Sequence, residues 1–540
     1  MRWKAPIAVI VCTLFFFCAM GGCRGADRPD TRPGASGQDS ARASGQVPGS
    51  ELLQVSVALW GLDDALSQKE NDQFYQYLKD KFHIELTPVP INWDDYGQKI
   101  VLWASSGNLP DIFAMDAVGT NYYRDWLNRE LIRPLPSDLS GYPALDEYLR
   151  AAGTENLKDA GKLYFIPRRL YDSIQYCVHD RNVFYRWDLA QQAGIRKEPE
   201  TWDEFGSMLR TIIGKDPERK GIAGLTLVNI KHISGLFWLY SNPAAASDGS
   251  GNDYKWIRED GRYIPAVFSG KSLASLVNLR EMYEQGLIDR EAVSNKGTQG
   301  YEAFATGKAA AILMKGYGNL DTMVKAKWDE TYPGREFTEC VKRARNFPAV
   351  DGKSYQCTFK TFWSESYFNS GMSDEKTDRV LSLYNDMLLP ETKEFYRFGV
   401  LGTDYEKDGG RIIPITPEAE LAEKQHSAAV LGSLVEYDDQ FQYDPNNFTL
   451  DPAIRRMAAR DIEIDMRSTE IPAFEDRLTY LSTPAKDKFP IYDYEDMIKV
   501  MLSEEPVGRI WAGIVEGYKA KGLDQVIREV NAWASEHGIN

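Results

Sequence analysis

The stretch from residue 104 to residue 116 constrains the fold more than any other part of the chain. It reads Ala-Ser-Ser-Gly-Asn-Leu-Pro-Asp-Ile-Phe-Ala-Met-Asp, so Gly107 is expected to end a helix and Pro110 to open a short apolar strand. Gln54–Trp60 is an earlier β-rich run, and Asn71–Phe82 between the two runs has a helical pattern. Strand, helix and strand at this spacing predict a βαβ unit with parallel strands and a right-handed connection.

The carboxyl ends of these two strands are where a ligand is expected. Ligands of open parallel sheets bind in the crevice beyond the carboxyl ends of the strands. Trp60 and Gly61 stand at the end of the first strand, and Met115 and Asp116 stand at the end of the second. The sequence therefore predicts a binding site near Trp60 and Asp116.

Further elements follow along the chain. Thr201 with Glu204 forms a capping box that predicts a helix running to about residue 213. The pattern of Asn182–Ala193 predicts another helix, and Ala309–Met314 predicts a buried strand. Phe362–Glu365 is a further short segment, followed by a long helical pattern over Ser373–Leu389. This alternation of helices and strands indicates an α/β protein.

The amino-terminal segment has the features of a secretion signal. Met1–Lys4 is basic and Ala5–Met20 is an apolar run, slightly short for a membrane span. Small residues before Cys23 resemble the lipobox of bacterial lipoproteins, although Met20 stands where that pattern prefers Leu. Residues 1–22 are thus expected to be a signal peptide and Cys23 the lipid attachment site, with an uncleaved anchor helix as the alternative. Residues 23–50 have hardly an apolar side chain and are expected to form a lipidated flexible tether.

Charge and cysteine content exclude two classes of protein. The net charge of −16 argues against a nucleic-acid binder, which needs a basic face. Beyond the leader only Cys177, Cys340 and Cys357 remain, so the chain is not a disulfide scaffold. Cys340 and Cys357 could bridge a hairpin or remain as two buried thiols, and the thiols are the preferred interpretation.

Enzyme signatures are missing from the sequence, but one enzymatic alternative stays open. The five histidines are scattered, and there is no zinc-type cluster, Gly-x-Ser-x-Gly elbow or P-loop. A cell-surface glycoside hydrolase or lyase remains possible, because its two carboxylates can come from any part of an acidic chain. A sugar-sensing lipoprotein is a third possibility.

Several segments together resemble a known family. They are Trp93-Asp-Asp-Tyr, Gly107-Asn-Leu-Pro-Asp-Ile-Phe, the Gly161–Pro167 hairpin, Pro199-Glu-Thr-Trp-Asp-Glu-Phe, Tyr283–Asp289, Phe304-Ala-Thr-Gly-Lys-Ala-Ala-Ala-Ile-Leu and the closing Asn531–Gly538 helix. In this order they are similar to the extracellular solute-binding proteins, family 1, of ABC importers, the sugar-binding type. Large lipoproteins from Gram-positive bacteria offer the nearest likeness, which spans about residues 51–540.

The resemblance implies a periplasmic-binding-protein-like α/β fold, with two lobes joined by a hinge around a central ligand cleft. Residues 51–172 plus 347–400 would form lobe I, and residues 176–340 plus 401–540 would form lobe II. The implied function is to bind an oligosaccharide, or another polar solute, and to deliver it to the membrane subunits of an ABC permease. The protein would be a monomer held by its lipid at the extracytoplasmic face of the cell membrane, without cofactor or enzymatic activity.

The resemblance also implies a set of ligand-binding residues and the loss of one metal site. Asp216-Pro-Glu-Arg-Lys-Gly221 stands where large relatives often carry a calcium loop, and Arg219 and Lys220 replace oxygen ligands there. No calcium is therefore expected at that loop. The expected aromatic contacts are Trp60, Trp238, Tyr317 and Trp363, and the polar ones are Asp63, Asp116, Arg169, Asn319 and Glu365.

Overall fold

The computed structural model describes residues 51–93, 95–151, 154–173, 176–177, 181–241, 254–295, 298–356, 361–471 and 474–539. The predicted signal peptide, Cys23, the tether and Cys357 lie outside these ranges. Cys340 lies inside them and takes part in no disulfide. In the described part of the chain, no helix has the length and apolar character needed to cross a membrane.

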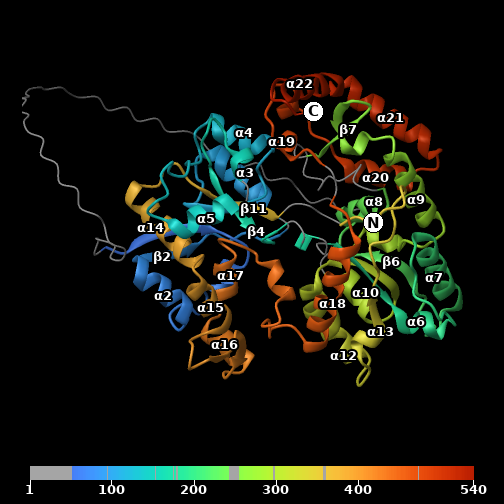
Figure 1. Cartoon of the computed structure of the whole chain (residues 1–540), viewed down its shortest axis with the longest axis horizontal. Helices are drawn as coiled ribbons and strands as arrows, with labels where there is room; N and C mark the ends of the chain where they lie inside the picture. The colour runs from blue at the N-terminus through green and yellow to red at the C-terminus, as the bar shows by residue number, and fades with distance from the viewer. Residues whose placement is uncertain are drawn as a thin grey trace, which may run out of the picture. The chain divides into compact units, whose positions relative to one another are not determined.

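A five-stranded sheet, here called the first sheet, contains the predicted βαβ unit (Figure 1). Its order is β2-β1-β3-β11-β4, and β1 pairs in parallel with β2 and with β3, which confirms the predicted parallel pair. Strand β2 was not predicted, because its alternation covers only five residues. The strands are β1 (Leu53–Ala58), β2 (Ile84–Pro88), β3 (Ile112–Met115), β4 (Phe165–Arg169) and β11 (Phe362–Phe368).

Local signals place the ends of these elements where the sequence predicts them. Helix α3 (Tyr96–Ser106) is followed by its cap Gly107, whose φ of 73° is left-handed as expected of a helix cap. The side chain of Asp72 accepts a hydrogen bond from the backbone N–H of Tyr75 at 2.8 Å and thereby caps α2. Asp111, just before β3, accepts from the N–H of Ser56 at 2.8 Å and so aligns β3 with β1.

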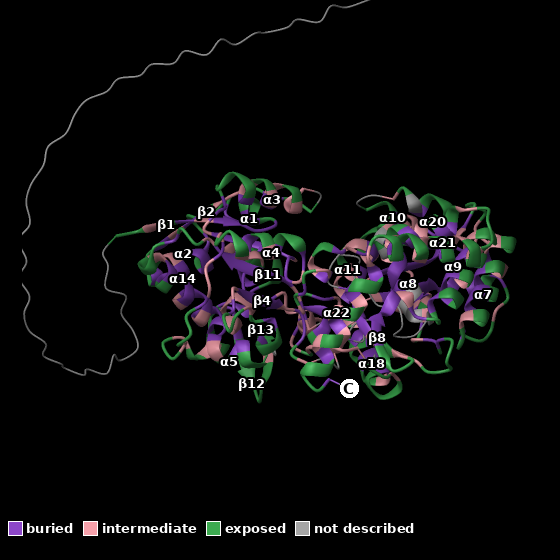
Figure 2. Cartoon of the chain, turned by 90° about the horizontal axis from the view of Figure 1, so that it is seen from above, coloured by how far each residue is buried: buried purple, intermediate pink, exposed green. Residues whose placement is uncertain are grey.

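Helices on both sides bury the first sheet in one hydrophobic core, the first core. Strand β11 runs antiparallel to both of its neighbours, β3 and β4. The strands are buried and the outer helix faces are exposed (Figure 2). The covering helices are α2 (Gln73–Phe82), α3 (Tyr96–Ser106), α4 (Asn121–Asn128), α5 (Pro143–Ala151), α14 (Asp374–Met387), α15 (Pro390–Phe398) and α17 (Ala428–Gly432).

A second sheet has the order β10-β5-β9-β6. The helix predicted over residues 182–193 is wrong in its first part. Arg181–Arg186 forms strand β5, and only α6 (Trp187–Gln192) is helical. Val183, Phe184 and Tyr185 favour a strand, and pairing with β9 and β10 outweighs the helical pattern. The other strands are β6 (Ala223–Leu227), β9 (Ala309–Lys315) and β10 (Val341–Arg343).

The two faces of the second sheet bury different cores. Along β9, Ala311 and Leu313 enter the second core, whereas Ile312 and Met314 enter the third core, as the period-two alternation of a strand requires. The second core is covered by α6, α7 (Trp202–Lys215), α8 (Ile233–Ser241), α9 (Ser272–Glu284), α20 (Asp493–Leu502), α21 (Val507–Ala520) and α22 (Leu523–Glu536). The third core is covered by α10 (Gln299–Ala305), α12 (Ala326–Thr331) and α18 (Pro452–Ser468).

The chain passes between the cores at positions that differ from those expected. Leu434 and Val435 still belong to the first core, and Tyr443 is in the third core, so this passage lies beyond residue 435 rather than near residue 400. Phe347, expected in lobe I, packs in the second core. The apolar pattern of a helix shows that one face is buried but not against which sheet.

Smaller elements complete the fold. Two hairpins are formed by β7 (Trp256–Glu259) with β8 (Arg262–Pro265) and by β12 (Tyr405–Asp408) with β13 (Arg411–Pro414). The short helices are α1 (Leu62–Ala65), α11 (Tyr317–Asn319), α13 (Phe337–Cys340), α16 (Glu418–Lys424) and α19 (Asp476–Thr479).

Candidate functional site

Five aromatic side chains gather beyond the carboxyl ends of β1 and β2 and at the start of β11. Trp60 and Trp93 are stacked, with ring centroids 4.8 Å apart and planes 8° apart. Trp363 lies 5.4 Å from Trp60, and Tyr96 meets Trp60 edge-on at 4.9 Å. Tyr437 extends the group, 5.5 Å from Trp363. These five residues are the aromatic cluster.

The aromatic cluster offers a partly exposed surface on a buried base. Trp93 is 60% exposed, whereas Trp60 beneath it is 6% exposed. Trp93 also lies 5.8 Å from Trp363, which is half-buried. Stacked rings with an exposed face suit the apolar C–H face of a planar or ring-shaped polar ligand.

A distortion of strand β11 accompanies the position of Trp363. The register of β11 against β4 shifts between Phe362 and Glu365, and Ser364 has a positive φ of 62°. Such a bulge interrupts the alternation of side chains and turns a residue toward a new direction. The backbone strain therefore occurs next to a residue of the aromatic cluster, where strain is commonly associated with function.

Charged groups surround the rings. The hydroxyl of Tyr96 donates to Asp116 at 2.9 Å, and burial together with this carboxylate raises the pKa of Tyr96. Lys315, at the end of β9, pairs with Asp439 at 2.5 Å and lies 5.7 Å from the ring of Tyr437. The site thus combines residues from the first sheet, the second sheet and the segment after residue 435.

The structure brings three of the predicted site residues together. Trp60 and Trp363 are in the aromatic cluster, and Asp116 is bound to its Tyr96. Asp63 is exposed on α1, and no described contact joins its carboxylate to the cluster. The side chain of Trp238 lies outside the described residues, although its backbone belongs to α8.

Two other predicted residues occupy structural positions. Tyr317 is fully buried and donates to Asp461 at 2.8 Å, and burial raises its pKa well above the ordinary value. Glu365 is also fully buried and accepts from the backbone N–H groups of Ala117 at 2.9 Å and Val118 at 3.2 Å. Both side chains are therefore held by hydrogen bonds within the protein, and direct contact of either with a ligand stays a prediction.

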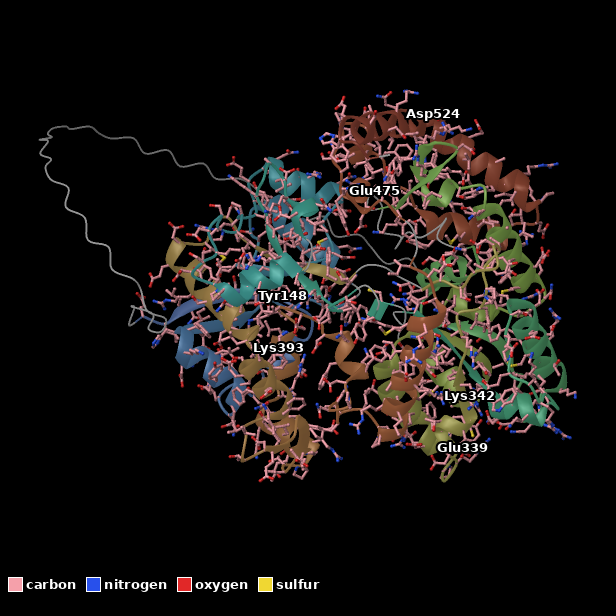
Figure 3. All side chains as sticks on the ribbon, viewed as in Figure 1. Tyr148, Glu339, Lys342, Lys393, Glu475 and Asp524 are labelled. Atoms are coloured by element: carbon pink, nitrogen blue, oxygen red, sulfur yellow. The ribbon has the colours of Figure 1, made fainter. Side chains whose placement is uncertain are left out.

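The remaining two predicted residues make contacts within the protein. The guanidinium of Arg169 lies 4.1 Å from the ring of Tyr148, which Figure 3 labels, and forms an ion pair with Glu436 at 3.7 Å. Lys393, also labelled there, pairs with the same Glu436. Asn319 donates to the hydroxyl of Tyr301 at 3.1 Å. Arg169 therefore anchors the segment after residue 435 to β4.

Sequence reasoning missed most of the residues that complete the site. Trp93 and Tyr96 belong to the Trp93-Asp-Asp-Tyr segment, which supported the family resemblance but was not assigned to the site. Tyr437 and Lys315 approach each other only through folding, since they are far apart in the sequence. The signal that could have been used was the family segment with Trp93 and Tyr96.

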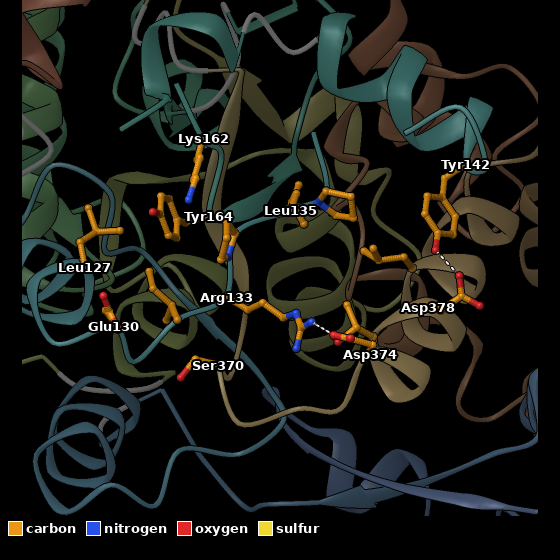
Figure 4. Close-up of a pocket in the computed structure, with 15 residues that line it drawn as sticks. Leu127, Glu130, Arg133, Leu135, Tyr142, Lys162, Tyr164, Ser370, Asp374 and Asp378 are labelled. Atoms are coloured by element: carbon orange, nitrogen blue, oxygen red, sulfur yellow. Dashed lines mark hydrogen bonds and ion pairs between the residues drawn. The ribbon is translucent and has the colours of Figure 1, made fainter. Parts of the chain in front are cut away.

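A cavity among the described residues lies elsewhere. It has a volume of about 820 Å³ and is lined by Arg133, Tyr142, Lys162, Tyr164 and residues of α14 (Figure 4). Lys162 precedes β4 and Ser370 follows β11, so this cavity is at the end of the first sheet opposite the aromatic cluster. None of its lining residues belongs to the aromatic cluster.

The side chain of Lys220 makes several contacts at the Asp216–Gly221 loop, where the sequence predicts no calcium. The ammonium of Lys220 lies 2.7 Å from Glu218, and it donates to the hydroxyl of Tyr332 at 2.7 Å and the carbonyl of Thr306 at 2.8 Å. Asp216 accepts from the backbone N–H of Lys220 and Gly221, both at 2.9 Å. The described residues contain no group of three or more side chains arranged to hold a metal.

Replacing Lys220 by methionine is expected to lower the free energy of unfolding by about 1–2 kcal/mol, because Glu218 loses a charged partner. Burial raises the pKa of Glu218, but Lys220 and Tyr332 lower it more, and the net pKa is lowered. The stability that Glu218 contributes is thus present above about pH 4.3 and lost as the pH falls through its folded pKa. In Lys220→Met the loss of stability in acid should begin at a higher pH than in the native protein. Melting temperatures measured between pH 7 and pH 3 check this.

A matched control is Lys327→Met, which breaks an exposed ion pair with Glu330 at 2.7 Å. It should change stability by less than about 0.5 kcal/mol. Calcium chloride and EDTA should leave the melting temperature of the native protein unchanged. If calcium raised the melting temperature of the native protein but not that of Asp216→Asn, the loop would bind calcium. That result would contradict the prediction that no calcium binds there.

Comparison with known proteins identifies the family. The family model described as bacterial extracellular solute-binding protein matches residues 66–337. The polygalacturonan/rhamnogalacturonan-binding protein YtcQ of Bacillus subtilis (strain 168) is 20% identical over 451 residues, which cover 82% of this chain and 81% of YtcQ. Lipoprotein LipO of the same organism is 22% identical over 344 residues, covering 60% and 62% of the two chains.

Solved structures show the same fold at low sequence identity. The alginate-binding protein AlgQ2 superposes with a TM-score of 0.66 at 16% identity, over 90% of this chain and 98% of AlgQ2. FusA, an ABC-transporter substrate-binding protein of S. pneumoniae in complex with kestose, has a TM-score of 0.65 at 15% identity, over 90% and 99%. The two-lobed α/β fold expected from the sequence is thereby confirmed, and the chain belongs to the bacterial extracellular solute-binding protein family.

Proposed function

We propose that this protein binds an oligosaccharide at the aromatic cluster and delivers it to the membrane subunits of an ABC importer. The observation that carries the proposal is the stack of Trp60, Trp93 and Trp363 at the ligand-binding end of the first sheet. Aromatic faces match the C–H faces of sugar rings, and nearby carboxylates and cations match hydroxyl groups. The set of ligand contacts we propose is therefore Trp60, Trp93, Tyr96, Asp116, Lys315, Trp363 and Tyr437.

The names of similar proteins support a saccharide. YtcQ is a binding protein for polygalacturonan and rhamnogalacturonan, AlgQ2 binds alginate, and FusA was solved with kestose. Each of these ligands is an oligo- or polysaccharide. A cell-surface hydrolase or lyase is not favoured, since the family and its neighbours are binding proteins.

We propose lobe boundaries from the packing of the cores. The first lobe comprises residues 51–169 and 362–435, and the second comprises residues 181–347 and 444–539, from which Tyr480 packs on the first core. The connecting segments would be residues 170–180, 348–361 and 436–443. Closure of the lobes over the ligand would make the loaded protein distinguishable to the permease, provided that the ligand binds the closed form more tightly.

We further propose a monomeric lipoprotein at the extracytoplasmic face of the cell membrane. Cys23 would carry the lipid, and residues 24–50 would let the folded part reach about 30 Å from the membrane. The name of LipO as a lipoprotein supports this arrangement. No cofactor and no enzymatic activity form part of the proposal.

A thermal-shift screen tests the function. The folded part, residues 51–540, is mixed with neutral and acidic oligosaccharides, and each mixture is also analysed for degradation products. Binding of at least one oligosaccharide should raise the melting temperature without forming products, because a ligand stabilises the state to which it binds. Product formation would support the enzymatic alternative, and the lack of any shift across the panel would contradict an oligosaccharide receptor.

A further inference from the structure

Arg168 is a buried cation at the base of the aromatic cluster. Its side chain is 0% exposed. Its Nε donates to the carbonyl of Ser433 at 2.5 Å, its Nη1 to the hydroxyl of Ser364 at 3.0 Å and its Nη2 to the hydroxyl of Ser433 at 3.3 Å. All three acceptors are uncharged, and no described carboxylate forms an ion pair with Arg168. Burial of a charge without a counter-ion is unfavourable, so this arrangement calls for an explanation.

The charge of Arg168 lies directly against the rings. Its guanidinium carbon is 4.3 Å from the ring centre of Tyr437 and 5.1 Å from that of Trp60. Lys315 lies 5.7 Å from the same Tyr437 ring, so two cations contact one residue of the aromatic cluster. A buried charge acts over several ångströms, because little water screens it.

Three carboxylates near the aromatic cluster make contacts within the protein. Asp116 accepts from Tyr96, Asp439 pairs with Lys315, and the Oε2 of Glu365 accepts from the backbone after β3. Arg168 and Trp60 differ from these groups, because neither side chain has a charged acceptor in the described part of the chain. The buried Nε1 of Trp60 has no acceptor among the described residues, and the guanidinium of Arg168 has five N–H groups, more than the three hydrogen bonds it makes.

From the buried charge of Arg168 against the rings, with Lys315 beside the same Tyr437, and resting on the proposed function, we infer that the saccharide bound at the aromatic cluster carries carboxylates. The ligand class is an oligosaccharide that contains uronic acid residues. Its carboxylate supplies the negative charge that Arg168 lacks, and Lys315, which is partly exposed, contacts that carboxylate at the surface. Arg168 acts through its charge from beneath the rings and so determines specificity. The overall charge of −16 repels an anion at long range, which makes these local cations necessary.

The test compares charged and neutral forms of the same sugar by isothermal titration calorimetry. The probes are tri-uronates of the galacturonate and alginate types, each paired with its carboxyl-reduced, neutral counterpart. The native protein should bind one tri-uronate at least tenfold more tightly than its neutral counterpart. Arg168→Met should weaken binding of that tri-uronate about 10- to 100-fold and that of the neutral sugar less than threefold.

Two further variants separate the charge of Arg168 from its packing. Arg168→Lys retains the charge and should recover most of the preference for the uronate. Lys315→Met removes the partly exposed cation and should also lower affinity for the uronate but not for the neutral sugar. If Arg168→Met does not fold, Lys315→Met alone tests the inference. Lys162→Met, an exposed cation at the opposite end of the first sheet, is the control and should change neither affinity.

Other results would overturn the inference. Equal losses for charged and neutral sugars in Arg168→Met, with no effect of Lys315→Met, would show that Arg168 only supports the packing of the rings. Tighter binding of the neutral counterparts by the native protein would exclude a uronate while leaving the oligosaccharide function intact. If no uronate binds but a neutral oligosaccharide stabilises the protein, the inference fails alone; if no saccharide of either kind binds, the proposed function fails with it.

Discussion

Replacing Trp363 by alanine is expected to weaken oligosaccharide binding by roughly 30- to 100-fold, or about 2–3 kcal/mol. The indole contacts Trp60, Trp93 and Tyr437, so its removal takes away one stacking face and loosens the others. Calorimetric titration with the best ligand from the thermal-shift screen measures the loss. Trp93→Ala should lower affinity as well with little loss of stability, because that ring is 60% exposed.

The matched control is Trp533→Ala. Trp533 is also half-buried and stacks on another ring, that of His537 at 4.0 Å, but it belongs to α22. It should lose comparable stability and retain full affinity. If Trp363→Ala and Trp93→Ala both bind as tightly as the native protein, the aromatic cluster is not the ligand site.

Gly224→Ala is expected to destabilise the second sheet by about 3 kcal/mol or more. A Cβ atom at this position of β6 would lie 2.1 Å from the carbonyl oxygen of Leu287 and 2.6 Å from its carbonyl carbon. That oxygen accepts a hydrogen bond from the N–H of Leu225 at 2.7 Å, so the backbone cannot move away without breaking it. Urea unfolding followed by tryptophan fluorescence measures the change.

Gly513→Ala provides the contrasting substitution. Gly513 is exposed on α21, and a Cβ atom there would meet nothing within 4 Å. Alanine favours the helix, so this variant should be more stable than the native protein by about 0.5–1 kcal/mol. A Gly224→Ala protein as stable as the native one would mean that the Leu287 segment does not pack on β6 as described.

Much of the local structure was predictable because its causes are local. The αL cap at Gly107, the capping residue Thr201 and the buried strand Ala309–Met314 all follow from residues within a few positions of each other. Strand β5 was one exception, since pairing with β9 and β10 decided the state of residues 181–186. Sequence patterns report propensity, and strand pairing with distant segments can override it.

The candidate site was predictable in its location but not in its membership. Trp60 and Asp116 follow from the rule that ligands bind at the carboxyl ends of strands, and both lie at the site. Glu365 and Tyr317 have side-chain types suited to sugar binding, but they satisfy backbone donors or a buried carboxylate instead. Whether a polar residue serves a ligand or the protein depends on its neighbours in space.

The sequence by itself determined the α/β class, the parallel pair β1 and β3, and the end of the sheet where a ligand is expected, because helix caps, alternation and strand direction are short-range properties. Only the tertiary structure decided which rings stack, that the buried cation Arg168 lies beneath them, and that Leu434 and Val435 belong to the first core. The physical reason is that burial and electrostatic compensation depend on groups that are distant in the sequence. Such groups meet only when the chain has folded.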